Sequence, residues 1–353
     1  MPTINMRSSA TDIKGQGVGA CYEELVRLVQ NGLPKNFQVL INSPKICDIM
    51  HYHTVNFGYY IERLTRGRKA VNIGYVHFLP DTLDDSLRLN WLVKKIFYKY
   101  LINFYNSMDY LVTVNPSIIE KIKQYDLNRP KLLCIPNFVS EQNFFPIEQD
   151  KIPALREKHG LPQNKFIALG VGQLQTRKGV FDFIETAKKT PGVHFAWAGG
   201  FSFGKLTDGY DEIKKLVANP PENVSFIGMV DREEMNEVYN AADVMFLPSF
   251  DELFPMAILE ALACKKPVLL RDIDVYKEIL FDHCPKAADA DGFSAHLRAL
   301  SADSGEYARW CEESWQCHKK YDEESALKMW EKFYTSIYNK AHASDAVLRE
   351  GTL

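Results

Sequence analysis

The feature that most constrains the fold is a twice-repeated alternation of short β-branched or aromatic runs with amphipathic stretches. Such alternation predicts strand–helix units wound around parallel sheets. The first series of expected strands spans residues 4–8, 37–42, 49–55, 71–78, 110–114 and 132–135, and the second spans residues 166–172, 194–198, 224–228, 244–248 and 267–270. A polar, proline-bearing segment at 136–153 separates the two series, which is typical of a linker between domains.

The length of the chain agrees with this division, because 353 residues exceed what one hydrophobic core usually supports. We therefore expect an α/β protein with two doubly wound domains that face a central cleft. The first domain is predicted at 1–140 and the second at 141–321. A last helix at 322–340 has apolar residues at helical spacing and is predicted to pack back on the first domain. Ligands of such sheets bind at the carboxyl ends of the strands, so the cleft is the expected site.

Composition narrows the class of protein. No apolar run approaches the ~18 residues that a membrane span needs, and the first twenty residues lack an apolar signal-peptide core, so a cytoplasmic protein is expected. The seven cysteines are scattered and form no Cys-x-x-Cys pair, which favours reduced core residues over disulfides or a zinc site. Residues 1–140 carry a net charge of +6 and the remainder –9, which indicates that the first domain faces something anionic.

The strongest local signal for chemistry is the stretch 250–260, which follows an apolar strand candidate. Pro255 suits a first helical turn, because its missing N–H needs no partner there, so a helix should start near Phe254. The free N–H groups and positive dipole end would then point into the cleft, where a diphosphate is a natural ligand. Glu252 lies just before this helix and Glu260 inside it, roughly 10 Å apart at ~1.5 Å per helical residue.

A second signal of the same kind lies at 172–179. There a strand end is followed by the basic pair Arg177 and Lys178, which opens a helix. Taken one at a time, two glutamates eight residues apart arise often by chance, and a basic pair at a helix start is usually a solvated surface. Occurring in order, each after an expected strand, the two stretches predict a site for a sugar diphosphate.

These two stretches resemble family four of the retaining glycosyltransferases, whose GT-B fold carries a Glu-x7-Glu motif at this strand-to-helix turn. The resemblance implies that Glu252 contacts the transferred hexose, that Glu260 binds the ribose hydroxyls of the nucleotide, and that Lys178 binds phosphate. The family usually has arginine where Gln173 stands, and Arg177 would supply that charge; Leu253 replaces a common glycine. The implied donor-binding residues in this part of the chain are Gln173, Arg177, Lys178, Phe254, Met256 and Glu260.

The first domain has its own glycine-rich turn, formed by Gly15, Gln16 and Gly17 after the first expected strand. With Ala20 it also matches the Gly-x-Gly-x-x-Ala fingerprint of dinucleotide-binding oxidoreductases. That alternative requires an acidic residue at the end of the second strand, and this strand ends Ile-Asn-Ser instead. The glycosyltransferase family also has a glycine-rich loop here, beside the donor phosphates.

Histidines lie on two expected strands. His77 lies at the end of the strand at 71–78, and the resemblance implies that it reaches the donor hexose near the bond that breaks; a core histidine is the alternative. Glu252 and His77 are therefore the predicted catalytic residues. His51 and His53 alternate along another strand, but no third ligand accompanies them, so no metal is expected.

A basic, aromatic segment at 88–105 contains no acidic residue. On a helical wheel one face, which should pack on the domain, holds Leu89, Leu92, Val93, Ile96, Phe97, Tyr100 and Phe104. The opposite face also carries Ile102 and Tyr105, and its predicted membrane-binding residues are Arg88, Trp91, Lys94, Lys95, Tyr98 and Lys99. Aromatic rings interleaved with basic side chains suit anionic lipid headgroups. A helix covered by a neighbouring loop is the alternative, and the absence of a recognisable module disfavours nucleic acid.

Further stretches are similar to bacterial glycolipid synthases. They are residues 4–9, 14–17, 75–80, 114–116, 135–140 and 269–272. These enzymes add a second hexose to α-monoglucosyl-diacylglycerol in Gram-positive bacteria, giving galactosyl-glucosyl or diglucosyl lipid of the kind that anchors lipoteichoic acid. The resemblance implies a UDP-glucose or UDP-galactose donor, no metal or other cofactor, and a peripheral position on the inner face of the cell membrane. A soluble sugar acceptor, or a non-catalytic membrane-bound nucleotide-sugar sensor, remain alternatives.

Overall fold

The computed structural model of the chain describes residues 1–10, 17–80, 91–202 and 204–350, without the side chains of Arg68 and 344–350. It contains two six-stranded sheets in which every printed strand pair is parallel. The strands of the first sheet are β1 (Thr3–Arg7), β2 (Gln38–Ile41), β3 (Ile49–Tyr52), β4 (Val71–Tyr75), β5 (Tyr110–Thr113) and β6 (Lys131–Cys134). Those of the second are β7 (Phe166–Val171), β8 (Val193–Ala198), β9 (Val224–Gly228), β10 (Val244–Leu247), β11 (Val268–Arg271) and β12 (Lys286–Ala287).

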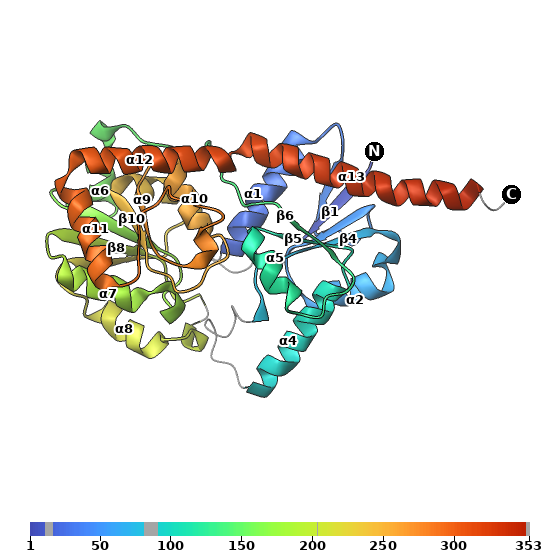
Figure 1. Cartoon of the computed structure of the whole chain (residues 1–353), viewed down its shortest axis with the longest axis horizontal. Helices are drawn as coiled ribbons and strands as arrows, with labels where there is room; N and C mark the ends of the chain where they lie inside the picture. Colours follow the sequence, from blue (N-terminus) through green and yellow to red (C-terminus); the bar gives the residue numbers. More distant parts are fainter. Residues whose placement is uncertain (11–16, 81–90, 203, 351–353) are drawn as a thin grey trace.

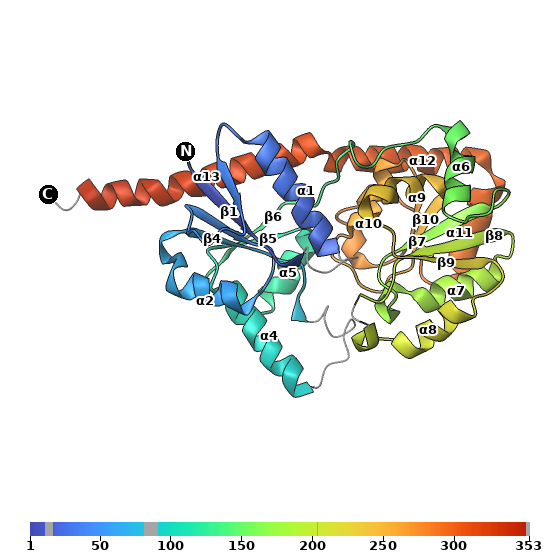
Figure 2. The ribbon, with the colours of Figure 1, turned by 180° about the vertical axis from the view of Figure 1, so that it is seen from behind.

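Helices lie on both faces of each sheet (Figures 1 and 2). The first domain has α1 (Gly17–Gly32), α2 (Phe57–Thr65), α4 (Trp91–Asn106) and α5 (Pro116–Lys123). The second has α6 (Ile152–Lys158), α7 (Val180–Lys189), α8 (Tyr210–Ala218), α9 (Met235–Ala241), α10 (Met256–Ala263), α11 (Ala290–Ala302) and α12 (Ser304–His318). The expected doubly wound α/β architecture with two domains is therefore confirmed.

The order of the strands indicates where a ligand would bind. The second sheet runs β12-β11-β10-β7-β8-β9, so the order reverses between β7 and β10. In open parallel sheets this switch point leaves a crevice at the carboxyl ends, where ligands bind. The segments that follow β7 and β10 are the two stretches in which the sequence predicts phosphate binding. The first sheet runs β2-β1-β3-β4-β5-β6, and its switch point lies between β1 and β3.

The last helix, α13 (Glu323–Glu350), continues from α12 on the second domain and crosses back over the first domain (Figure 1). Trp330 and Tyr334 are buried in the core that also contains Ile4, Met6 and Ile73 of the first sheet. The hydroxyl of Tyr334 lies 2.9 Å from Nδ1 of His51. The expected packing of a C-terminal helix on the first domain is thus observed, and one apolar core runs through both domains.

The structure corrects two local expectations. The linker is shorter than 136–153, because the 3₁₀ turn η3 (Gln149–Lys151) and α6 already begin within it, with Pro153 in the first turn of α6. In addition, α10 begins at Met256, with Pro255 as the residue before the helix and not inside it. Proline is tolerated at both positions, so its presence alone does not fix the first residue.

Candidate active site

The two stretches in which the sequence predicts phosphate binding meet at a close backbone approach. Gly179 ends the 3₁₀ turn η4 (Thr176–Lys178) with φ +73° and leads into α7. A Cβ atom at this position would lie 2.2 Å from the carbonyl oxygen of Pro248, which follows β10. Only glycine fits such an approach in the left-handed region. The turn that carries Lys178 is thereby held against the loop that carries Glu252.

Lys178, Arg177 and Glu252 form a buried charged cluster at this junction. Nζ of Lys178 lies 2.5 Å from Oε1 of Glu252, and Nη1 of Arg177 lies 3.7 Å from Oε2 of the same carboxylate. Burial raises the pKa of Glu252, but the two cations outweigh it and hold the pKa below its ordinary value, whereas burial lowers the pKa of Lys178. Glu252 is therefore ionised, and two cations lie beside it at the junction of the two stretches.

Residues from both domains hold the backbone between Glu252 and α10. Arg177 donates a hydrogen bond to the carbonyl oxygen of Asp251. From the first domain, Nδ2 of Asn115 donates to the carbonyl of Leu253 at 3.1 Å, and Nδ2 of Asn137 donates to the carbonyl of Phe254 at 2.9 Å. Positive φ occurs at three described non-glycine residues, and Leu253 is not among them, so its backbone does not require the glycine of related sequences.

Neither asparagine was assigned a role from the sequence. Both occur in stretches that resemble the glycolipid synthases, at 114–116 and 135–140, and this was the only available signal. Asn115 also caps α5, where its side chain accepts from the N–H of Ser117, and it donates to the carbonyl of Val275 at 2.8 Å. Together with Asn137 it ties the backbone at Leu253 and Phe254 of the second domain to the first domain.

At the start of α10, free backbone N–H groups could contact a ligand, whereas the side chains of Phe254 and Met256 are buried. Phe254 and Met256 are 3% and 5% exposed, and the Phe254 ring packs against Tyr321 at a centroid distance of 4.9 Å. Their side chains therefore belong to the core, and any donor contact from these two predicted residues has to come from the main chain. Free N–H groups at a helix start suit an anion.

Glu260 is buried one turn inside α10. Its Oε1 accepts from Nη1 of Arg232 at 2.7 Å, and its Oε2 accepts from the hydroxyl of Tyr239 at 2.7 Å. Both carboxylates of the Glu-x7-Glu pair are thus partnered by cations or hydroxyl donors of the protein. Arg232 was not predicted, since no local pattern marks a residue that pairs with a carboxylate 28 positions away.

His77 follows β4 and lies in a stack of aromatic rings. Its ring is 4.5 Å from that of Tyr75, nearly parallel at 17°, and 5.8 Å from that of His53. Burial lowers the pKa of His77 to about 3, so the ring is neutral near pH 7. Its buried Nε2 has no hydrogen-bond partner among the residues that the structure describes. A neutral imidazole can donate or accept one hydrogen bond at a sugar hydroxyl without adding charge.

Comparison with known proteins of related sequence shows the family to which the chain belongs. The chain is 42% identical over 331 residues to alpha-galactosylglucosyldiacylglycerol synthase of Streptococcus pneumoniae, which covers 94% of this chain and 88% of the relative. The chain belongs to the group 1 glycosyltransferases. The model of that family, described as "Glycosyl transferases group 1", matches residues 151–315. Processive diacylglycerol alpha-glucosyltransferase of Acholeplasma laidlawii is 34% identical over 190 residues, 54% of this chain and 56% of that protein.

Solved structures agree on the fold. Sucrose-phosphate synthase from Thermosynechococcus elongatus has a TM-score of 0.78 at 15% identity, covering 96% of this chain and all of that one. HepE of Anabaena, solved with UDP-glucose, has a TM-score of 0.74 at 14% identity, covering 95% of this chain and all of that one. The predictions of a GT-B fold and of a glycosyltransferase are confirmed, and the oxidoreductase alternative loses its basis.

Three predicted residues of this glycosyltransferase lie at or beyond the limits of the description. Gly15, Gln16 and Arg88 are outside the described residues. Gly17 is the first residue of α1, and a Cβ atom there would meet nothing within 4 Å. Gln173 follows Gly172 at the end of β7 and is partly buried.

The predicted packing of α4 is wrong in its first half. Leu92, Val93 and Ile96, expected against the domain, are 51%, 51% and 64% exposed, whereas Tyr105, expected outside, is buried and donates to the carbonyl of Phe78. In Figure 1, α4 projects from the first domain, and its buried residues, Leu101, Phe104 and Tyr105, all lie in its carboxyl-terminal half. Of the predicted membrane residues, Trp91 is 72% exposed, Lys95 and Lys99 are exposed, and Lys94 and Tyr98 are half-buried.

Helix α2, which the sequence did not single out, lies beside α4. The Tyr100 ring contacts the Phe57 and Tyr60 rings at 6.3 and 5.7 Å. Phe57, Ile61 and Leu64, at positions of one helical face, are 69%, 43% and 40% exposed. The amino-terminal half of α4 and this face of α2 together form an exposed apolar surface, which we call the α2–α4 surface. In 1–10, 17–80, 91–202 and 204–350, no helix is long and apolar enough to cross a membrane.

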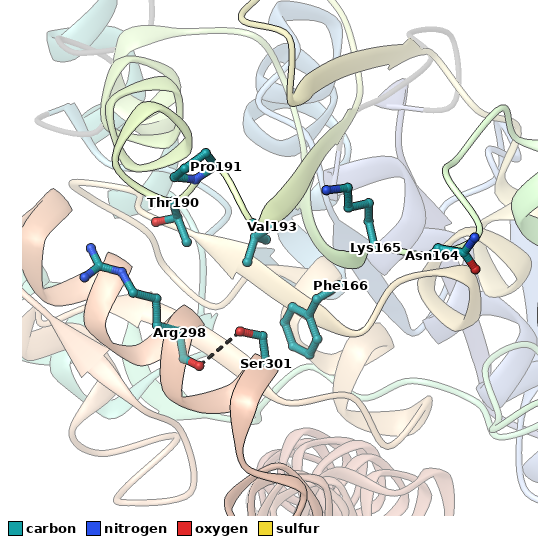
Figure 3. Close-up of a pocket in the computed structure, with 9 residues that line it drawn as sticks. Asn164, Lys165, Phe166, Thr190, Pro191, Val193, Arg298 and Ser301 are labelled. Atoms are coloured by element: carbon teal, nitrogen blue, oxygen red, sulfur yellow. Dashed lines mark hydrogen bonds between the residues drawn. The ribbon is translucent and has the colours of Figure 1, made fainter.

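A hollow of about 470 Å³ lies away from the donor site. It is formed at the amino ends of β7 and β8, where Phe166, Val193 and Arg298 line it (Figure 3). This is the edge of the sheet opposite to the switch-point crevice. Within the described part of the chain, no three His, Cys, Asp or Glu residues are grouped so that they could hold a metal ion.

Proposed function

We propose that this glycosyltransferase transfers a hexose, galactose or glucose, from a UDP-sugar to α-monoglucosyl-diacylglycerol at the inner face of the cell membrane. The observation that carries the proposal is the 42% identity, over 94% of the chain, to alpha-galactosylglucosyldiacylglycerol synthase. The processive diacylglycerol alpha-glucosyltransferase of Acholeplasma laidlawii, a second relative, supports a glycolipid acceptor. Family membership favours an enzyme over a non-catalytic sensor.

In the proposed division of labour, residues 1–140 with the helix 322–340 bind the acceptor and the membrane, and residues 141–321 bind the donor. The positive net charge of the first segment and the negative charge of the remainder support this division. The donor diphosphate would lie between η4 and the start of α10.

The chemical task is to stabilise the negative charge that grows on the leaving diphosphate. Lys178 and Arg177 are fixed cations in a buried site, and N–H groups at the start of α10 add positive potential without reorganisation. Glu252 would accept hydrogen bonds from hexose hydroxyls, and the neutral His77 would contact the hexose near the breaking bond. Attack from the face that the diphosphate leaves would retain configuration, with a departing phosphate oxygen taking the acceptor proton.

The deciding assay mixes the protein with anionic vesicles that contain diacylglycerol or α-monoglucosyl-diacylglycerol, radiolabelled UDP-glucose or UDP-galactose, and EDTA. We expect label in the lipid phase with one donor and with the monoglucosyl acceptor, undiminished by EDTA. Transfer to a soluble sugar with no lipid label would replace this proposal by the soluble-acceptor alternative. Loss of transfer in EDTA, restored by a divalent cation, would overturn the metal-free mechanism.

The α2–α4 surface is proposed to hold the enzyme on the membrane. Exposed apolar side chains bordered by Lys95 and Lys99 match an anionic lipid surface, where each basic residue contributes about 1 kcal/mol of binding. We expect Lys95→Glu to reduce the fraction bound to anionic vesicles by at least fivefold at low salt, and Ile96→Ser to reduce it further. Vesicle flotation measures both.

Lys188→Glu is the matched control for this prediction. Lys188 is an exposed lysine at the end of α7 in the second domain, so its reversal changes the net charge equally. It should bind vesicles as wild type does. Equal losses for Lys95→Glu and Lys188→Glu would mean that overall charge, and not the α2–α4 surface, determines binding.

A further inference from the structure

We propose that Arg232 is a positioning residue, which orients the carboxylate of Glu260 toward the nucleotide ribose and ties that carboxylate to the first domain. The inference rests on the UDP-sugar donor of the proposed function and on the ribose contact that the resemblance implies for Glu260. The inference adds Arg232, which lies outside the Glu-x7-Glu pair, to the residues of the proposed donor site. It also links donor binding to the arrangement of the two domains.

The guanidinium of Arg232 bridges two buried carboxylates from different domains. Its Nη1 lies 2.7 Å from Oε1 of Glu260 on α10, and its Nη2 lies 3.0 Å from Oε1 of Glu24 on α1. Glu24 and Glu260 are 3% and 4% exposed. Two buried carboxylates on adjoining helices would repel each other strongly in a medium of low dielectric constant, and the single positive charge of Arg232 between them offsets this repulsion.

The guanidinium also contacts the segment that joins the domains. The Phe144 ring lies 5.2 Å from the central carbon of Arg232, in the geometry of a cation–π contact. The side chain of Asn143 donates to Oε1 of Glu24 at 3.0 Å. Burial alone would lower the pKa of Arg232, but Glu260 and Glu24 outweigh it and raise the pKa. Arg232 is thus a permanent cation between the first domain, the connecting segment and the donor site.

The hydrogen bonds at Glu260 leave it able to bind a diol. An ionised carboxylate offers about four lone-pair sites, two on each oxygen. Arg232 uses one site on Oε1 and Tyr239 uses one on Oε2, so the plane of the carboxylate is fixed and one site on each oxygen remains. The 2′- and 3′-hydroxyls of a ribose present two adjacent donors that match this pair. Without Arg232 the carboxylate would keep Tyr239 alone and could rotate.

Glu24 restrains Arg232 from the other side. Glu24 is also bound by Arg27 at 3.2 Å, and Arg27 reaches Glu323 at the start of α13 at 3.0 Å. Separation of the domains would remove Glu24 from Arg232 and release the orientation of Glu260. Ribose affinity should therefore be highest in the closed arrangement, where the bridge is complete.

Calorimetric titration of the full-length protein with UDP and with 2′-deoxy-UDP tests this without an acceptor. Wild type should bind UDP at least tenfold more tightly than 2′-deoxy-UDP. Arg232→Gln should bind UDP about tenfold more weakly and should no longer distinguish the two ligands, because Glu260 is no longer aligned. Arg232→Lys keeps the charge between the carboxylates and should recover part of the discrimination. Glu24→Gln should bind UDP about threefold more weakly than wild type. This difference should disappear when Glu24→Gln is combined with Arg232→Gln.

The control is Arg309→Gln, which removes an exposed arginine of α12 and should leave both affinities unchanged. Thermal unfolding shows whether each variant is folded. If Arg232→Gln does not fold, Arg232→Lys is compared with wild type instead. Full discrimination between UDP and 2′-deoxy-UDP in both folded variants would overturn the positioning role while leaving the proposed function intact. Absence of UDP binding by wild type would overturn the proposed donor, and this inference with it.

Discussion

Lys178→Ala should lower kcat/KM for transfer by about 100- to 1,000-fold, the loss that follows removal of one preorganised group that stabilises transition-state charge. Lys178 is almost fully enclosed, and its ammonium lies 2.5 Å from Glu252, so no mobile surface lysine can replace it. We expect most of the loss in kcat, because the charge on the diphosphate grows only as the glycosidic bond breaks. Initial rates at varied donor concentration separate kcat from KM.

Lys189→Ala is the matched control. Lys189 ends α7, eleven residues away, and pairs with Asp291 at the surface, so its removal should change kcat/KM less than twofold. A combined Lys178→Ala and Glu252→Gln variant distinguishes charge balance from catalysis. If the double variant regained most of the lost activity, Lys178 would serve only to neutralise Glu252, and its assigned role at the diphosphate would be wrong.

The sequence was sufficient to predict the neighbours in this cluster. Lys178 follows β7 and Glu252 follows β10, and adjacent parallel strands bring their carboxyl ends together. All eleven expected strands are present with boundaries that differ by a few residues, because short apolar runs bounded by turn residues mark the strands of such a sheet. The short edge strand β12 was missed, since two residues carry no periodic pattern.

Contacts between distant segments could not be predicted. The bridge from Arg232 to Glu24 joins residues 208 positions apart, and the bond from Asn115 to Leu253 joins residues 138 apart. Helical periodicity likewise could not show how far α4 extends beyond the sheet. Its amphipathic pattern gives the direction of an apolar face, but not whether a neighbour or solvent meets that face.

Lowering the pH from 6.5 to 4.5 should destabilise the protein steeply, because three buried histidines remain neutral in the folded chain. Burial lowers the pKa of His51 and of His77 to about 3, and burial lowers the pKa of His53 well below its ordinary value. In the unfolded chain these rings take up protons near pH 6.5. Below that pH the unfolded state binds protons that the folded state does not bind. The free energy of unfolding therefore falls with pH until the pKa of each histidine in the folded protein is reached.

Each histidine should contribute a slope of about 1.4 kcal/mol per pH unit in this range, which is large against a total stability of about 5–15 kcal/mol. Urea titrations at half-unit intervals measure the slope. His53→Leu should reduce the slope by the contribution of one histidine. It should also raise the stability near pH 5, because neither ring nitrogen of His53 has a hydrogen-bond partner among the described residues.

The control is His342→Gln, which replaces an exposed histidine of α13 that lies outside the stack of His51, His53 and His77, and the same urea titrations give its slope for comparison. The contrast matters for activity as well as for stability. His77 stacks in series with Tyr75 and His53, so a folded protein that took up protons there near pH 6 would charge the ring assigned to the hexose. An unaltered slope in His53→Leu, with folding intact, would show that His53 takes up its proton in the folded protein and would contradict a neutral, buried stack.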